Sequence, residues 1–228
     1  MLADESRVLG RFGHKASMSS IREQSVHALF NDMGISSASL PDPQADCTQA
    51  QSVCKTLAHG DQPHLGIGEA PDNVVDLMTF YAQNLAVPAR RGVSSAAVLK
   101  GKALFYNSGC TGCDVPKHIT SRSAEQQDHQ FQLVWPYTDL LLHDMGKWLA
   151  DNAADGEASG QEWRTAPLWG IGLAKTVNKN TTFLHDGRAS TLLEAVLWHG
   201  GEAQASVDRV LTMSVNQRDE LIQFLESL

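Results

Sequence analysis

Apolar residues recur at helical rather than strand spacing in the periodic segments of the chain. Two of these segments begin with capping boxes, Ser20-x-x-Glu23 and Thr191-x-x-Glu194, whose side chains satisfy the first free amides of a helix. Gly34 follows the first apolar run and is typical of a helix end. The segments predicted to be helical are 20–34, 71–81, 95–109, 191–200 and 221–228.

Long stretches without a period separate these helices. Residues 35–70 are rich in Ser, Pro, Asp, Gln and Gly, and residues 86–92 have the composition of a linker. Between residues 110 and 187 strand patterns are absent and turn residues are frequent, with a short helix expected to start at 165–167. We therefore predict an all-α fold whose long loops need a further surface, such as a flat cofactor, to pack on.

The four cysteines fall into two pairs. Cys47 and Cys54 lie in the polar stretch, where a disulfide formed in an oxidising compartment is the favoured interpretation and two free surface thiols are the alternative. Cys110 and Cys113 form a C-x-x-C motif after a predicted helix. Because no β-α-β pattern surrounds this motif, it favours attachment of c-type haem over thioredoxin-like chemistry.

Charge excludes some classes of partner. The formal net charge of -8 argues against nucleic acid or an anionic membrane, since phosphates would be repelled, but it leaves a basic protein partner open. No apolar run approaches the length of a membrane-spanning helix. Residues 1–7 carry acidic side chains where a secretory signal would be basic and then apolar, so we expect no export signal in this sequence.

The residue that follows the C-x-x-C motif departs from haem attachment. Two thiols about one turn apart meet the porphyrin, and a histidine directly after them binds the iron, whereas residues 110–114 read CTGCD. Carboxylate is a hard oxygen ligand and does not replace imidazole on haem iron. Asp114 therefore leaves the use of the two thiols open.

Three interpretations follow from Asp114. Haem c could still attach through one or both thiols, with His199 and His118 as iron ligands. Cys110 and Cys113 could instead form a disulfide or an exchangeable dithiol in a haem-free module. They could also bind zinc together with His118 and one further residue, since C-x-x-C with a nearby histidine supplies suitable ligands.

A family resemblance is carried by seven runs spread along the chain in order. The runs are 10–13 (GRFG), 31–35 (NDMGI), 85–91 (LAVPARR), 101–113 (GKALF into GCTGC), 136–146 (PYTDLLLHDMG), 162–170 (EWRTAPLWG) and 184–189 (LHDGRA). They resemble the bacterial di-haem oxidoreductase family, which is related to di-haem cytochrome c peroxidases. The segment 101–113 is similar to the first helix and haem motif of a class I cytochrome c domain.

The resemblance implies a division of the chain and a function. Residues 89–228 would form a class I cytochrome c-like domain, and residues 1–88 the C-terminal remnant of a first haem domain whose motif would lie upstream of Met1. The expected function is electron transfer by c-type haem in a periplasmic, peroxidase-like oxidoreductase. The partner would be a redox protein or the missing upstream haem domain. The alternative is a haem-free, non-catalytic helical module for interaction or scaffolding.

The resemblance also assigns residues. Cys110 and Cys113 correspond to the thioether cysteines, and Asp114 stands where the family has its proximal histidine. His199 lies at the position of the distal iron ligand in peroxidase relatives. An imidazole on the apolar face of a capped helix needs a partner, so the residue pattern agrees, although a histidine bonded to a carbonyl is the alternative.

Three further residues have weaker assignments. His185 lies in a turn that is close to the haem in relatives, and a turn-stabilising role is the alternative. Met145 is a rival distal ligand, since thioether ligation occurs in cytochromes, or it is simply a core residue. Arg164 could pair with a haem propionate, because guanidinium matches carboxylate geometry, or with a surface acid.

Overall fold

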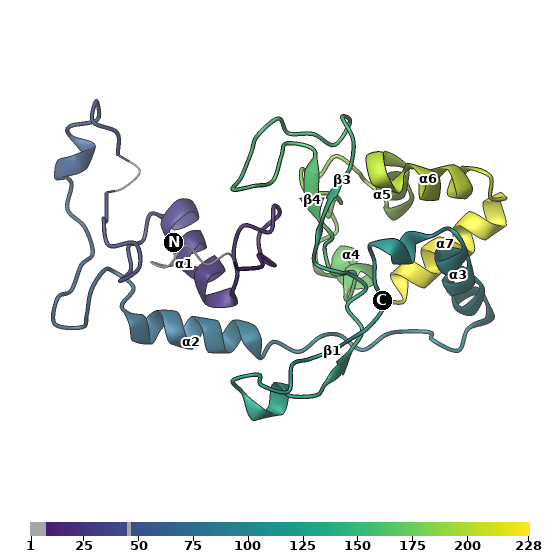
Figure 1. Ribbon diagram of the computed structural model, residues 1–228, viewed down its shortest axis with the longest axis horizontal. Coiled ribbons are helices and arrows are strands. Elements are labelled where there is room, and N and C mark those ends of the chain that lie inside the picture. Colours follow the sequence, from purple (N-terminus) through teal and green to yellow (C-terminus); the bar gives the residue numbers. More distant parts are fainter. Residues whose placement is uncertain (1–7, 45–46) are drawn as a thin grey trace. The chain divides into compact units, whose positions relative to one another are not determined.

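The computed structural model describes residues 8–44 and 47–228 (Figure 1). The expectation about the N-terminal residues 1–7 lies outside the described residues. The chain divides into two compact units. The first comprises the described residues up to Gly13 together with Met18–Ala86, and the second comprises His14–Ser17 and Val87–Leu228. The assignment of residues 1–88 to a remnant haem domain stays a prediction.

The first unit is built on two helices, α1 (Ile21–Met33) and α2 (Asp72–Gln83). The Ser20 hydroxyl accepts a hydrogen bond from the Glu23 amide at 3.1 Å, and Gly34 ends α1 in the left-handed conformation, as predicted. The small core between the helices consists of Val26, Leu29, Ala70 and Val75. The expected disulfide is present: Cys47 is bonded to Cys54, which begins a short 3-10 turn, Cys54–Thr56.

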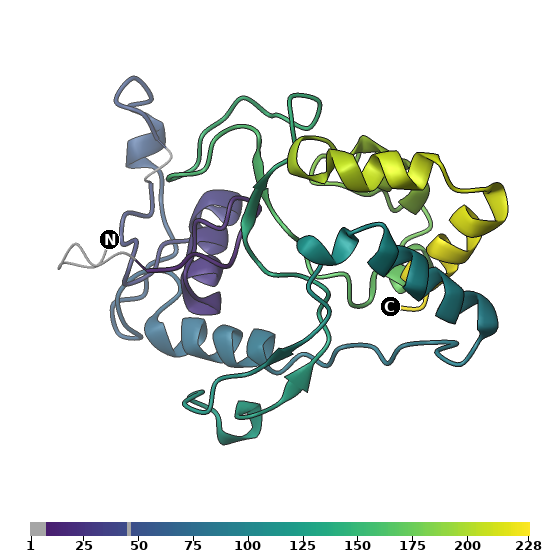
Figure 2. The ribbon, with the colours of Figure 1, turned by 45° about the vertical axis from the view of Figure 1, so that its right-hand side comes forward.

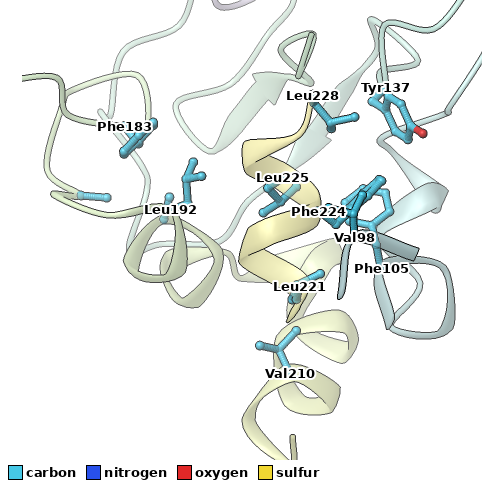
Figure 3. Close-up of a cluster of buried hydrophobic side chains, with 12 residues drawn as sticks. Val98, Phe105, Tyr137, Phe183, Leu192, Val210, Leu221, Phe224, Leu225 and Leu228 are labelled. Atoms are coloured by element: carbon cyan, nitrogen blue, oxygen red, sulfur yellow. The ribbon is translucent and has the colours of Figure 1, made fainter. Parts of the chain in front are cut away.

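The second unit centres on the packing of α3 (Ala96–Asn107) against α7 (Val215–Glu226). Figures 1 and 2 both show the two helices side by side. Gly101 makes this approach possible, because a Cβ there would overlap the Glu220 carbonyl oxygen and lie 2.8 Å from Phe224 Cβ. The rings of Phe105, Tyr137 and Phe224 meet around this contact, with centroids 5.2 to 6.0 Å apart (Figure 3).

Three shorter helices complete the second unit: α4 (Ala174–Val177), α5 (Leu192–Trp198) and α6 (Gln204–Leu211). The Thr191 hydroxyl caps α5 by accepting from the Glu194 amide at 3.1 Å, as predicted. Helix α6 was not predicted. The helical turn expected at 165–167 begins later, at Ile171, where a 3-10 turn leads into α4.

The fold is mostly helical, but the all-α expectation omitted two small antiparallel pairs. Strand β1 (His118–Ile119) pairs with β2 (Leu133–Val134), and β3 (Leu142–Asp144) pairs with β4 (Glu162–Arg164). Strands of two or three residues are too short to leave an alternating pattern in the sequence. Among the described helices, none is both long enough and apolar enough to cross a membrane.

Candidate functional site

The C-x-x-C motif lies in a tight turn directly after α3. Gly109 adopts φ 83° and leads into a 3-10 turn, Cys110–Gly112, in which the Cys113 amide donates to the Cys110 carbonyl at 3.3 Å. A Cβ on Gly109 would lie 2.6 Å from Arg209 Nη1, and that nitrogen donates to the Ser108 carbonyl at 2.9 Å. The turn is therefore held against α6 through a contact that only glycine allows.

Both thiols of the motif are free and half-buried. Burial raises the pKa of the Cys110 thiol to about 12, and the negative charge of Asp114 adds to this effect. Burial also raises the pKa of the Cys113 thiol to about 11, with Asp139 as the next cause. Because the thiolate is the nucleophile in disulfide exchange, two thiols that stay protonated at neutral pH are poorly suited to dithiol chemistry.

Asp114 follows the same turn and is half-buried. The backbone amide of Asp114 donates to the Cys110 carbonyl at 3.0 Å. Burial is the main cause that raises the pKa of Asp114 to about 7; the nearby Asp139 charge also raises it, and His143 opposes the rise. The carboxyl group is thus partly protonated near neutral pH, unlike an exposed aspartate.

A chain of hydrogen bonds links the motif to the segment that follows α5. The Asp139 amide donates to the Cys113 carbonyl at 2.9 Å, and the Asp139 carboxylate lies 2.8 Å from His143 Nε2. His143 Nδ1 lies 2.8 Å from a carboxylate oxygen of Glu202. The other Glu202 oxygen accepts from the Asp144 amide at 3.0 Å. We call Asp114, Asp139, His143 and Glu202 the acidic cluster.

The imidazole of His143 balances part of this negative charge. Both of its nitrogens face carboxylate oxygens, an arrangement that favours the doubly protonated ring. Burial lowers the pKa of His143, but the hydrogen bonds to Glu202 and Asp139 outweigh burial and raise it overall. In turn, the hydrogen bond from His143 lowers the pKa of Glu202. Sequence reasoning missed His143, Asp139 and Glu202 as members of the site.

His199 follows directly after α5 and is half-buried. Its Nδ1 donates to the Ala195 carbonyl at 2.7 Å, since a carbonyl oxygen can only accept. Burial lowers the pKa of His199, which favours the neutral ring with its free lone pair on Nε2. A neutral imidazole with one nitrogen fixed by a carbonyl is the form that binds a metal.

The surroundings of His199 and of the motif overlap. Cys110 and Val196, which precedes His199 on α5, pack against the same hydrophobic core. Met145 is half-buried beside this segment: a Cβ on Gly200 would lie 3.0 Å from its carbonyl oxygen. Together with the hydrogen-bond chain to Glu202, these contacts bring the C-x-x-C turn and the His199 segment into one region of the second unit.

His118 is exposed on β1, and its Nε2 lies 2.7 Å from the Thr138 carbonyl oxygen. One ring nitrogen is therefore engaged, which leaves Nδ1 for any ligand. No group of three or more His, Cys, Asp or Glu side chains in residues 8–44 and 47–228 is arranged to hold a metal ion. The zinc interpretation thus gains no support from the positions of Cys110, Cys113 and His118.

His185 and Arg164 flank another cluster, around Trp163. The His185 ring stacks on the Trp163 indole at 3.4 Å between centroids, and Lys15 Nζ lies 3.6 Å from the indole centroid. Burial lowers the pKa of His185 and also that of Arg164, which is half-buried on β4. The structure places His185 against Trp163, while its role near a haem and the pairing of Arg164 with a propionate both stay predictions.

The donor types of this region, two thiols and an imidazole, are those that a covalently attached haem with one imidazole ligand would need. Two half-buried thiols lie at the 3-10 turn. The His199 ring uses Nδ1 for the Ala195 carbonyl, so Nε2 is the nitrogen that would bind iron. Asp114 does not replace a second imidazole ligand, because a carboxylate is a poor ligand for haem iron. Attachment of haem through Cys110 and Cys113 and ligation by His199 therefore stay predictions.

The ionisation of Asp114 predicts a dependence of stability on pH. Because its pKa in the folded chain is raised to about 7, the folded chain binds a proton more tightly than the unfolded chain does. The Asp114 contribution to the free energy of unfolding is therefore largest below pH 4 and is expected to fall as the pH rises from about 4 to 7.

The variant Asp114→Asn should flatten this part of the pH profile, measured by urea unfolding at several pH values. The matched control is Asp128→Asn, because Asp128 is exposed. A control profile that changes as much as the Asp114→Asn profile would rule out this origin of the pH dependence.

Comparison with known proteins adds one finding. The chain matches the family model described as "Di-haem oxidoreductase, putative peroxidase" over residues 3–228. Searches of curated proteins and of solved structures gave no match.

Proposed function

The chain belongs to the di-haem oxidoreductase family, and from this premise we propose that it is a c-type haem electron-transfer part of a peroxidase-like, periplasmic protein. The observation that supports this most is that two free thiols after α3 and the His199 imidazole after α5 lie in the same region of the second unit. The disulfide Cys47–Cys54 agrees with an oxidising compartment. The partner would be a redox protein or an upstream haem domain.

Bound haem supplies the chemistry of this proposal, since its iron takes up and releases single electrons. Cys110 and Cys113 would hold the porphyrin covalently, and Gly109 with Arg209 fixes the direction of their turn. His199 Nε2 would bind the iron, while the Ala195 carbonyl keeps the ring in the required tautomer. Phe105 and Tyr137 belong to the buried core beside this turn, which excludes water there.

Production in a host with cytochrome c maturation machinery tests this proposal. We expect the intact mass to increase by one haem and the protein to show a Soret absorption band. The double variant Cys110→Ala, Cys113→Ala should lose both signals, whereas a variant of the disulfide pair, Cys47→Ala with Cys54→Ala, should keep them. A colourless wild-type protein whose Cys110 and Cys113 both react with an alkylating reagent would reject the proposal.

A second function has one observation in its favour. Asp114 stands at the position where an iron ligand is expected, and in the same cluster the Asp139 and Glu202 carboxylates are both hydrogen-bonded to the His143 ring. A haem-free helical module for interaction with another protein would need no ligand there. This function predicts a folded, colourless and metal-free protein, so the same mass measurement separates the two.

A further inference from the structure

A pocket of about 290 Å³ lies in the second unit, and no residue of the C-x-x-C turn or of the acidic cluster lines it. Its walls come from the linker before α3, from β2 and from the loop before α4. Two of the lining side chains are indoles and only one is charged. The lining residues are Val87, Pro88, Arg90, Leu133, Val134, Trp135, Trp169 and Leu228.

Arg90, the charged lining residue, is not neutralised. Its Nη2 donates to the Ser227 hydroxyl at 2.9 Å, but its Nε is buried without a hydrogen-bond partner. Among residues 8–44 and 47–228, no carboxylate side chain forms an ion pair with it. A guanidinium that lines a pocket without a carboxylate side chain as partner suits an anionic ligand, because it donates charge-assisted hydrogen bonds to carboxylate oxygens.

The surroundings of Arg90 add apolar and aromatic surface rather than acids. Its guanidinium carbon lies 5.4 Å from the Phe224 ring centroid and 6.0 Å from that of Tyr137. The Tyr137 hydroxyl is likewise buried without a hydrogen-bond partner. Lys117 adds a second positive charge, with Nζ 5.6 Å from the Trp135 ring centroid. The pocket thus combines one positive side chain with two indoles and otherwise apolar side chains. Leu228, the last residue of the sequence, also lines it, and its main-chain carboxylate oxygen accepts from Arg91 Nη2 at 2.7 Å.

We propose that this pocket binds a small carboxylic acid with a flat apolar body. The carboxylate would pair with the Arg90 guanidinium, which offers donors in a geometry that suits two carboxylate oxygens. The flat body would lie against the Trp135 and Trp169 indoles. The volume is near the lower end of the range of small-molecule sites. This site goes beyond the electron-transfer role, because none of its residues belongs to the proposed haem attachment.

Calorimetric titration of the full chain with naphthoate and with its neutral isostere naphthamide tests the proposal. The two probes have the same flat body and differ in charge. We expect one molecule of naphthoate to bind, with an affinity at least about tenfold above that of naphthamide, because only the acid pairs with Arg90. Equal affinities, or no saturable binding of naphthoate, would overturn the proposal. This comparison uses the unaltered protein and needs no variant to fold.

Variants then locate the site. Arg90→Gln should abolish the preference for naphthoate over naphthamide, and Arg122→Gln, which removes an exposed arginine elsewhere, should keep it. Trp169→Ala should weaken both probes by a similar factor, because it removes stacking surface rather than charge. Retained preference in a folded Arg90→Gln variant, judged by unchanged circular dichroism, would overturn the assignment.

A last titration distinguishes a free acid from a carboxylate of bound haem. Naphthoate is expected to bind haem-loaded and haem-free protein with the same affinity, since no residue of the C-x-x-C turn lines the pocket. Loss of naphthoate binding on haem loading would overturn the proposal and assign Arg90 to a haem propionate.

Discussion

Gly101→Ala is expected to lower the free energy of unfolding of the second unit by about 3 kcal/mol, the upper end of what overpacking a core usually costs. The new methyl group would overlap the Glu220 carbonyl oxygen and press on Phe224 Cβ, so α3 and α7 would have to separate. The separation would open the core in which Phe105, Tyr137 and Phe224 meet. A gain in helix propensity of about 1 kcal/mol from alanine offsets only part of this cost.

Tryptophan fluorescence during denaturation measures this effect in the second unit alone. All five tryptophans of the chain lie between residues 135 and 198, within that unit. Gly112→Ala is the matched control, because a Cβ at Gly112 meets nothing within 4 Å. The packing argument fails if Gly101→Ala and Gly112→Ala unfold at the same denaturant concentration.

The helix ends of this protein were predictable because they depend on neighbours in the sequence. Ser20 and Thr191 each cap a helix through the amide three residues later, and Gly34 ends α1 in a conformation that glycine adopts readily. The disulfide of Cys47 and Cys54 was predictable for the same reason, since the pair lies in one short loop.

The acidic cluster was not predictable, because its members come from distant segments. His143 and Glu202 are 59 residues apart, and only the folding of the loops between β3 and α6 brings them to 2.8 Å. In the sequence, Asp139 is one of many turn residues, and only the structure shows that its amide donates to the Cys113 carbonyl. The same limit applies to the pocket at Arg90, whose linker, hairpin and loop residues share no pattern along the chain.

The distinction between the two candidate functions depends on a single side chain, Asp114. Its carboxyl group occupies the sequence position of an iron-binding histidine, and burial holds its pKa near neutrality. An imidazole at this position would supply an iron ligand from the haem motif itself, in addition to the one proposed for His199. The turn that carries residue 114 is set by Gly109 and by the Cys110 carbonyl, which accepts from the residue 114 amide.

Asp114→His is therefore expected to raise the fraction of chains that carry haem in a maturation-competent host, because the added imidazole gives the iron a ligand next to the two thiols. The absorption spectrum should change to that of iron with two strong axial ligands. Asp114→Asn removes the carboxylate without adding a ligand, so its loading should stay near that of the wild type. Equal loading of the two variants above the wild-type level would show that the charge, not the missing ligand, limits attachment, and equal loading at the wild-type level would show that residue 114 does not limit it. A colourless Asp114→His protein would instead favour the haem-free interaction module, because a complete motif beside His199 would then fail to bind the cofactor.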